Sequence, residues 1–481
     1  MTGSTPARIA AKRKFNFNIA FTRLMGPLKG RVAAAVVAAA LGAGASAHAQ
    51  TPVSGPCEAI SPSQAPCTLQ EKALQAPQLD ASARAQAVAD YQRSWTHRAV
   101  AFQSRLGDPL SLTAAAWVGT HNSFNALANG FTLSHGDSNQ QLTLSQQLDV
   151  DVRSIELDLH VLQRPQGATV VVCHGRGPDQ LHFGCTTEPT LAEVLPQVRD
   201  WLRAHPRAVL LLYLEDELGT ADGYAAAVEQ LHAGMRRQDG SSMLLRPVAP
   251  AAGRPCTSLP LALTRDAIRA QGAQVVLVGN CRAGWSSAVF GWDDTHVESG
   301  DTAAYRPAPA CDATYGRDVY ASKLVRYLED STLVAQAISP TTSPAQATAQ
   351  RLTPDKVAAM TACGVDLFGF DQLLPNDGRL AATVWSWAPG EPDLTRGHCT
   401  VQLTGGRWQS SACTGPERHP AACRAADATW WTSAAVPRPA AKTACAAAGG
   451  TFDVPRNGEQ DTALRAAAGG ATTWLNIAAS S

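Results

Sequence analysis

Short apolar segments alternate with helical patterns through the middle of the chain. The apolar segments close on polar residues and cover 114–119, 154–161, 169–173, 208–214, 274–279, 318–324 and 365–370. Between several of them apolar residues recur at helical spacing, as in 191–204, 223–237 and 258–270. Strands that alternate with helices indicate a parallel sheet. Seven or eight such units within 109–380 favour an α/β fold in the form of a closed (β/α) barrel over an open sheet.

The regions on either side of this pattern differ from it. Residues 50–108 read as an N-terminal arm followed by a helix over about 80–105, where Val88, Tyr91 and Trp95 recur at helical spacing. Residues 381–481 are rich in Trp and Cys, with many Gly and Pro. We expect this C-terminal part to be a small β-rich, disulfide-containing module whose tryptophans form its core.

Residues 1–49 have the three parts of a secretory signal peptide. Basic residues precede the small apolar run 32–45, and Ala47-His48-Ala49 is a cleavage sequence of the A-x-A type. Met1 or Met25 would serve as the start. A membrane anchor is the alternative, but the run is shorter than the roughly 20 residues that a span needs. We therefore expect a secreted or periplasmic protein.

Charge and cysteine content narrow the function classes. The whole chain balances 40 Lys+Arg against 40 Asp+Glu, and residues 1–49 contain no acidic residue, so the rest is net negative. Such a chain has no bulk attraction for nucleic acid. All 12 cysteines follow residue 49, which predicts disulfides in an exported protein. The local pairs that we expect are Cys57–Cys67, Cys173–Cys185 and Cys399–Cys413.

Polar residues gather where the predicted strands end. The first strand ends on His121 and Asn122, and Glu156 and Asp158 occupy one face of the second. The third predicted strand is followed by His174, and the fourth predicted strand is followed by Glu215. Taken alone, a histidine at a strand end would be an ordinary structural residue, and the pair Glu156 and Asp158 would be a solvated face of a strand. In a barrel, however, the strand ends converge on one mouth, and inward carboxylates would repel each other unless a cation were bound.

At these residues the sequence resembles a known family. The matching runs are G-T-H-N-S-F at 119–124, V-R-S-I-E-L-D at 152–158, C-H-G at 173–175 and L-L-L-Y-L-E at 210–215. They resemble the catalytic half of the phosphatidylinositol-specific phospholipase C superfamily, and its calcium-dependent members more closely. The resemblance covers about 114–372. It implies a distorted (β/α)8 TIM barrel that cleaves a phosphodiester by internal attack of a neighbouring hydroxyl.

The resemblance also implies roles for individual residues. His121 and His174 match the two catalytic histidines. Either Glu156 or His121 would accept the hydroxyl proton, and His174 would protonate the leaving alkoxide. The matching calcium ligands are Asn122, Glu156, Asp158 and Glu215. Ca²⁺ prefers several oxygen ligands of these kinds.

Some positions depart from the family pattern. Asp151 stands where family members usually have glycine, so that turn is expected to differ. Arg282 and Lys323 are the best candidates for contacts to the phosphate or head group, although surface or salt-bridged roles are the alternative. Three aromatic residues of the following loop would either dip into a lipid surface or pack over the mouth: Trp285, Phe290 and Trp292.

Three functions compete at this point. The first is an exported Ca²⁺-dependent phosphodiesterase that acts as a monomer on a phospholipid or another phosphodiester. The second is a glycerophosphodiesterase or sphingomyelinase-D-like barrel, although His121 is followed by Asn122 and not by the expected Arg. The third is a catalytically inert glycan- or surface-binding protein, because part of 381–481 also resembles the later half of a C-type lectin domain.

Overall fold

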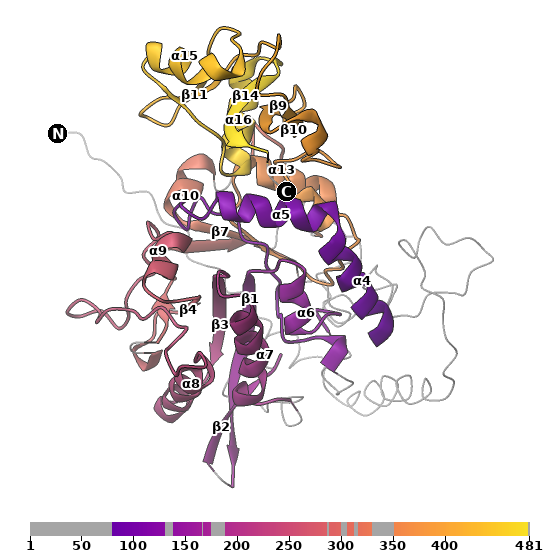
Figure 1. Ribbon diagram of the computed structural model, residues 1–481. Coiled ribbons are helices and arrows are strands. Elements are labelled where there is room, and N and C mark those ends of the chain that lie inside the picture. Colours follow the sequence, from indigo (N-terminus) through magenta and orange to yellow (C-terminus); the bar gives the residue numbers. More distant parts are fainter. Residues whose placement is uncertain are drawn as a thin grey trace, which may run out of the picture. The chain divides into compact units, whose positions relative to one another are not determined.

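The structure is a computed structural model that describes residues 79–129, 138–165, 167–174, 188–285, 288–299, 305–311, 316–329 and 351–479 (Figure 1). All of these residues belong to one compact unit. The predicted signal peptide and the Cys57–Cys67 pair lie outside them and stay predictions. Within the described part, no helix has the length and apolar character to cross a bilayer.

A five-stranded sheet runs in the order β2-β1-β3-β4-β5. Its strands are β1 (Ser154–Arg164), β2 (Gly167–Val172), β3 (Leu210–Glu217), β4 (Val275–Gly279) and β5 (Phe290–Gly291). β1, β3, β4 and β5 pair in parallel, whereas β2 runs antiparallel to β1. The prediction that 169–173 belongs to the parallel series is therefore wrong. Two residues separate β1 from β2, which suits a hairpin and is too short for a parallel crossover.

A second, parallel sheet contains β6 (His296–Ser299), β7 (Leu324–Leu328) and β8 (Leu367–Gly369). The short segment 117–120 links the two sheets, because Trp117 pairs with Leu367 of β8 and Gly119 with Ser154 of β1, both in parallel. Parallel pairing thus continues from β6 through β8 and β1 to β5.

The other edges of the two sheets meet in the segment 290–299. Only four residues separate β5 from β6, so the two are successive parts of one extended segment rather than neighbouring parallel strands. Trp292 N–H donates to the Gly279 carbonyl of β4, and Leu324 N–H donates to the Thr295 carbonyl. No pairing among the described residues joins β5 to β6. The architecture is mixed α/β, and closure into an eight-stranded barrel stays a prediction.

Gly119 lies where the linking segment is most crowded. A Cβ atom at this position would overlap the Phe368 carbonyl oxygen and would lie 2.9 Å from the Ser154 Cβ. Only glycine fits there without shifting a strand. The glycine therefore allows the segment that carries His121 to pass between β8 and β1.

Several helices of this part begin at capping residues whose side chains accept a hydrogen bond from the first turn. α7 starts with a capping box in which Thr190 and Glu193 exchange hydrogen bonds, and it matches the predicted helix 191–204. Ser94 ends α4 and caps α5, so the predicted single helix over 80–105 is two helices. The helices are α4 (Ala81–Arg93), α5 (Trp95–Leu106), α6 (Leu144–Asp149), α7 (Leu191–Ala204), α8 (Ala221–Gly234), α9 (Arg265–Ala270), α10 (Gly316–Ser322), α13 (Pro354–Cys363) and α14 (Arg379–Ala382).

Two predicted elements differ from the structure. Residues 318–324 were expected to be a strand, but α10 runs to Ser322 and β7 begins only at Leu324. The expected helix 258–270 begins at Arg265, where Thr264 caps it. In both cases the apolar pattern continues from a loop or helix into the next element. Periodicity alone does not show at which residue one element ends and the next begins.

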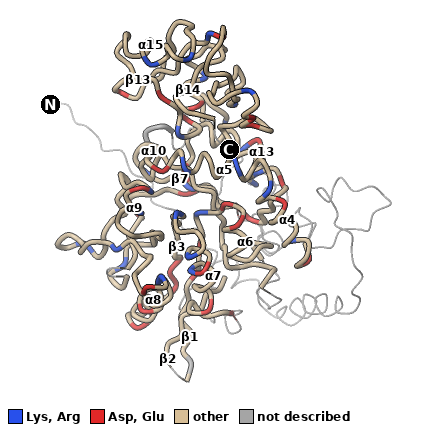
Figure 2. The backbone as a smooth tube through the Cα atoms, in the orientation of Figure 1, with Lys and Arg blue, Asp and Glu red and all other residues tan. Residues whose placement is uncertain are grey.

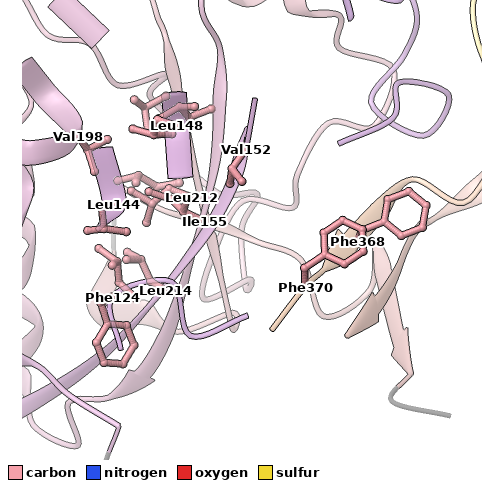
Figure 3. Packing of buried hydrophobic residues seen from close by; sticks show 14 of the residues in the cluster. Phe124, Leu144, Leu148, Val152, Ile155, Val198, Leu212, Leu214, Phe368 and Phe370 are labelled. Carbon is pink, nitrogen blue, oxygen red and sulfur yellow. The ribbon is translucent and has the colours of Figure 1, made fainter. Parts of the chain in front are cut away.

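The largest core cluster packs helices against one face of the parallel sheet. Figure 3 shows Ile155 of β1 and Leu212 of β3 beside Leu144 and Leu148 of α6. Every second residue of β1 thus faces this core, because side chains alternate along a strand. The residues between them face the other way, and they include the predicted site residues.

The turn before β1 has the conformation that the family's glycine would adopt. Asp151 has a φ of 68°, in the left-handed region that Asp tolerates better than most residues. Its carboxylate accepts a hydrogen bond from the Tyr91 hydroxyl at 2.9 Å and lies 2.7 Å from His97 Nδ1. The N-terminal helices α4 and α5 therefore hold a turn that glycine would form by itself.

The C-terminal part contains two three-stranded sheets, in the orders β10-β9-β14 and β12-β11-β13. Its elements are β9 (Cys399–Gln402), β10 (Trp408–Ser411), β11 (Ala422–Arg424), β12 (Trp430–Thr432), α15 (Ala441–Ala447), β13 (Thr451–Phe452), α16 (Gly458–Ala468) and β14 (Thr473–Ala478). The prediction that its tryptophans form a core is confirmed, since Trp385, Trp387 and Trp408 are buried together. The helix α16, capped by Asn457, was not predicted.

Disulfides hold both parts of the unit. Of the predicted pairs, Cys399–Cys413 is confirmed. Cys173 is disulfide-bonded, but Cys185 lies outside the described residues, so that pairing stays a prediction. Further bridges, which were not predicted, are Cys256–Cys281, Cys311–Cys363 and Cys423–Cys445.

Candidate active site

Three carboxylates meet on the neighbouring strands β1 and β3. Glu156 and Asp158 point away from the helical core, and the parallel register sets Asp158 opposite Glu215. One oxygen of each carboxylate lies within 4.8 Å of the others. The structure thus brings together three of the four predicted calcium ligands.

Burial and mutual repulsion perturb these acids strongly. Burial raises the pKa of Asp158 well above its ordinary value, and the charges of Glu215 and Glu156 raise it further. Burial, together with Glu156, raises the pKa of Glu215 to about 7. Acids in this state are stabilised in their charged form by a cation close to all of them.

Arg326 supplies one such positive charge from the opposite sheet. This residue of β7 is buried, and its guanidinium forms a short ion pair with Glu156 and a second pair with Glu298 at 3.1 Å. Burial alone would raise the pKa of Glu156, but Arg326 outweighs it and holds the pKa below its ordinary value. Arg326 therefore compensates Glu156, whereas no ion pair within the described residues joins a cation to Asp158 or Glu215.

His121 is held by a carboxylate from the last strand segment. Its Nδ1 lies 3.2 Å from the Asp371 Oδ1, and Asp371 is fully buried just after β8. Burial alone would lower the pKa of His121, but Asp371 and Glu156 outweigh it and raise the pKa to about 10. The imidazole is thus oriented through Nδ1, which is how a carboxylate positions a catalytic histidine.

A chain of side-chain amides connects Asp371 to Asp158. Asn139 donates from Nδ2 to both Asp371 oxygens, at 3.2 and 3.3 Å, so its own oxygen faces the other way. That oxygen accepts from the Asn122 Nδ2 at 3.2 Å and from the Asn125 Nδ2 at 2.9 Å. The Asn122 oxygen is consequently directed at the Asp158 carboxylate oxygens, at distances of 3.2 and 3.1 Å.

This oxygen-to-oxygen contact is informative. Rotating the Asn122 amide would let its nitrogen donate to Asp158, but its oxygen would then face the Asn139 oxygen at 3.2 Å. Neither oxygen can donate a hydrogen bond, so the rotation would only replace the contact between the Asn122 and Asp158 oxygens by one between the Asn122 and Asn139 oxygens. With Asn139 fixed by Asp371, the contact between Asn122 and Asp158 needs a proton or a cation between the oxygens. The Asn122 side chain thus lies against the carboxylate cluster, and its role as a ligand stays a prediction.

The backbone of Asn122 supports this arrangement. Its φ of 43° is left-handed, a region where Asn is enriched among residues other than glycine. This turn lets the Asn122 N–H donate to the Glu156 Oε2 at 3.2 Å. His121 and the carboxylates are therefore parts of one connected network.

His174 reaches the same end of the sheet by a different route. β1 and β2 extend past the rim as a hairpin, and β2 returns until Cys173 N–H donates to the Asp158 carbonyl at 3.1 Å. The half-buried His174 follows directly. Its place next to the strand of Asp158 thus comes from the return of the hairpin and not from the end of a parallel strand.

The predicted head-group contacts are not brought together. Arg282 is exposed beyond β4, beside Tyr224. Lys323 precedes β7 and so lies at its amino end. Neither position decides whether the side chain contacts a phosphate, so both contacts stay predictions.

The predicted membrane contact of the aromatic loop is wrong. Trp285 and Trp292 are each 1% exposed and Phe290 is 4% exposed. Trp285 Nε1 donates to the Asp216 Oδ2 at 3.2 Å, and the Trp292 ring packs on Tyr213 at 4.6 Å between centroids. The alternative of a packed loop is the one observed, since these rings already have apolar neighbours.

Sequence reasoning missed Asp371, Arg326 and Asn139. Asp371 follows the apolar run 365–370, so the strand-end rule that selected His121 also applied to it. Arg326 was hidden because the strand had been predicted too early in the chain. Asn139 lies on no strand, and no signal in the sequence singles it out.

Comparison with known proteins decides the family. A family model described as the Rv2075c PI-PLC-like domain matches residues 78–377, more than half of the chain. The chain belongs to this PI-PLC-like family. The uncharacterized protein Rv2075c of Mycobacterium tuberculosis (strain ATCC 25618 / H37Rv) is 53% identical over 394 residues, which cover 80% of each chain. The uncharacterized protein MT2135 of strain CDC 1551 / Oshkosh matches to the same extent.

Solved structures of phospholipases are more distant from this PI-PLC-like chain. The phosphatidylinositol-specific phospholipase C of Listeria monocytogenes is 17% identical, with a TM-score of 0.37 over 57% of this chain and 94% of its own. A Ca²⁺-dependent enzyme of this type from Streptomyces antibioticus is 17% identical, with a TM-score of 0.31 over 56% of this chain and 98% of its own. Values this low transfer no residue roles.

Proposed function

We propose that this protein is an exported, calcium-dependent phosphodiesterase of the phosphatidylinositol phospholipase C type. Its substrate would be a phospholipid or another phosphodiester with a hydroxyl next to the phosphate, and the protein would act as a monomer. Closure of the parallel sheet into a distorted barrel is part of the proposal. The disulfides of the described residues support export, because such bridges persist in oxidising compartments.

One observation carries the proposal. An oriented histidine and a cluster of oxygen ligands share one buried network, in which Glu156 raises the pKa of His121 and accepts a hydrogen bond from the Asn122 backbone. Internal attack needs a proton acceptor near the hydroxyl and positive charge near the phosphate. Both requirements are available within this network.

The residues fit a calcium ion by their chemistry. The set consists of Asn122, Glu156, Asp158 and Glu215, all oxygen ligands, as Ca²⁺ prefers. The Asn122 oxygen already faces Asp158 without a donor between them. When bound, Ca²⁺ would hold a non-bridging phosphate oxygen and lower the pKa of the attacking hydroxyl.

The side chains of the chain itself would perform the proton transfers. The substrate hydroxyl oxygen attacks phosphorus as its proton passes to His121 or Glu156, and the bond to the leaving oxygen breaks. His174 protonates that oxygen as it leaves. Asp371 and, to a smaller extent, Glu156 raise the pKa of His121 to about 10, so His121 is protonated at neutral pH in the absence of a further cation. Positive charge added beside Glu156 would lower this pKa, and Glu156 is the alternative proton acceptor.

The direct test is an activity screen with and without a chelator. Phosphatidylinositol, a glycosylated phosphatidylinositol and soluble diesters should be offered to the purified mature protein in Ca²⁺ or in EDTA. We expect turnover only in Ca²⁺, and a cyclic phosphate as the first product. His121→Ala and His174→Ala should each lower kcat by about 10²- to 10⁴-fold, whereas His398→Ala, at an exposed histidine of the C-terminal part, should not. Full activity in EDTA removes the calcium assignment, and an open phosphate as first product favours the glycerophosphodiesterase alternative.

A further inference from the structure

A second concave site lies beside the amino ends of β1 and β3. It is a cavity of about 450 Å³ lined by Val118, by Arg153 before β1 and by Val209 before β3. Helix α5 and residues of the C-terminal part, among them Asn457, complete its wall. The volume is in the range of cavities that hold small organic ligands.

Positive charge is concentrated in this cavity. Only two acidic residues line it, Asp108 and Asp151. Its arginines are Arg105, Arg153, Arg207, Arg265, Arg269 and Arg456. The remainder of the chain after residue 49 is net negative, so this excess of positive charge is local. Figure 2 shows basic segments between the labels of α5 and β3.

The arginines are only partly compensated. Asp108 pairs with both Arg265, at 3.1 Å, and Arg269, at 2.6 Å, and Arg269 also pairs with Asp266. Arg153 pairs with Asp151 and Arg456 with Asp453. In the described part of the chain, the exposed Arg105 and Arg207 form no ion pair. Guanidinium groups suit phosphate and carboxylate, which they bind through two parallel hydrogen bonds. The cavity is therefore prepared for an anion.

Two residues of the wall carry buried polar atoms. Trp117 is 1% exposed and Thr361 is 7% exposed. Within the described residues the Trp117 Nε1 and the Thr361 Oγ1 have no hydrogen-bond partner. Both atoms lie beneath the surface of the cavity, so the case for a ligand depends on the volume, the rings and the arginines of the cavity.

Aromatic rings give the cavity an apolar character as well. Trp117, Trp201, Phe368 and Trp385 all contribute to the wall. The Arg265 guanidinium lies 5.0 Å from the Trp117 ring centroid, and that of Arg153 lies 4.7 Å from the Trp201 ring. A wall of this kind accommodates a flat apolar body beside an anionic group.

We propose that this cavity is a ligand site for a small organic anion in which a phosphate or carboxylate group is attached to an apolar, preferably aromatic, body. The site is separate from the proposed active site, since neither His121 nor any of the three carboxylates lines the cavity. It places a ligand between the sheet, helix α5 and the C-terminal part. The two charged groups at the rim, Arg105 and Arg207, would bind the anion, and the rings would bind the body.

The test is calorimetric titration of the mature protein in EDTA with 2-naphthyl phosphate as the probe. The double variant Arg105→Ala/Arg207→Ala should weaken binding by about 10- to 100-fold, as expected for the loss of charged hydrogen bonds. Ala204→Trp, at an exposed residue of the rim, should block the cavity and abolish binding. Arg246→Ala removes an exposed arginine outside the cavity and should leave the affinity unchanged.

Two further arms identify what is recognised. 2-Naphthol lacks the anion and inorganic phosphate lacks the ring, so each should bind at least about tenfold more weakly than the probe. His121→Ala should leave binding intact if the probe occupies the cavity. Circular dichroism and the melting temperature show that each variant is folded. Loss of binding in His121→Ala, unchanged binding in both cavity variants, or no binding of the probe would each overturn the proposal.

Discussion

His121 Nδ1 lies 3.2 Å from the Oδ1 of Asp371, a residue that follows 250 positions later in the chain. The contact joins the first strand segment to the last, and Asp371 is itself fixed because its N–H donates to the Glu329 Oε2 at 2.7 Å. A buried carboxylate on Nδ1 leaves Nε2 as the nitrogen that can face a substrate. The position of the proposed base thus depends on the pairing of segment 117–120 with β8.

Replacing Asp371 by Asn should reveal this dependence. We expect kcat to fall by about 10²- to 10⁴-fold with a small change in KM, because an amide neither orients nor stabilises the imidazolium. Asp371 also raises the pKa of His121, so in EDTA the NMR titration of that imidazole should move from about 10 toward its ordinary value. Asp355→Asn, the same change at an exposed site, is the control. An unchanged titration in Asp371→Asn would contradict the role of the pair.

Arg326 should compete with calcium for Glu156. In Arg326→Met the buried carboxylates lose their internal cation, so the melting temperature should fall in EDTA. Added Ca²⁺ should then raise the melting temperature more in the variant than in the unaltered protein, because ligand binding stabilises the folded state by RT ln(1 + [L]/Kd). Arg254→Met alters an arginine that is half-exposed in its ion pair and serves as control. Equal calcium shifts in Arg326→Met and the unaltered protein would count against a cation at these carboxylates.

Asn139 should act on the proposed calcium site without touching the ion. In Asn139→Leu the Asn122 amide loses the partner that holds its nitrogen, and it can turn that nitrogen toward Asp158. Calcium affinity measured by calorimetry should fall by about 10- to 100-fold, as is usual when a group that orients a ligand is removed. The control Asn129→Leu changes an exposed asparagine of the 3-10 helix Leu127–Asn129. If both variants bind Ca²⁺ equally well, the amide chain does not orient Asn122.

The sequence was most informative where one local rule applied. The alternation of β1 identified Glu156 and Asp158, because period-two geometry needs no tertiary information. The strand-end rule that selected His121 was sufficient for Asp371 and was not applied to it. Trp285 and Trp292 could not be placed in this way, because whether an aromatic residue faces lipid or core depends on neighbours such as Tyr213 that are distant in sequence.

Other features required the assembled fold. The charge of Arg326 acts across the interior from β7 to β1, and the misplaced strand 318–324 concealed its inward position. The orientation of the Asn139 side-chain amide is set by Asp371, a partner 232 residues away in the chain. His174 was assigned to the site by resemblance, yet its route through an antiparallel hairpin is not the one that a regular barrel predicts. Long-range pairing of this kind leaves no periodic trace in the chain.

The stability of the C-terminal part should depend on pH through Asp461. This buried residue of α16 accepts hydrogen bonds from Trp408 Nε1 at 2.7 Å and Gln402 Nε2 at 2.8 Å. Burial raises its pKa to about 7 although both donors act in the opposite direction. The folded state therefore binds this proton more tightly than the unfolded state, whose carboxyl titrates near its ordinary value of 3.8. Stability from this group is complete below pH 4 and is lost as the pH rises through 7.

Asp461→Asn should remove that dependence. The amide oxygen can still accept the hydrogen bonds from Trp408 and Gln402, but it carries no charge at any pH. The melting temperature should therefore fall less steeply between pH 4 and pH 8 in the variant than in the unaltered protein. The two slopes should differ by up to about 1.4 kcal/mol of unfolding free energy per pH unit. Tryptophan fluorescence follows the transition, since Trp408 lies in this core. Asp222→Asn, at an exposed position of α8, should keep the slope of the unaltered protein. Parallel pH profiles for Asp461→Asn and the unaltered protein would show that Asp461 is charged in the folded state throughout this range.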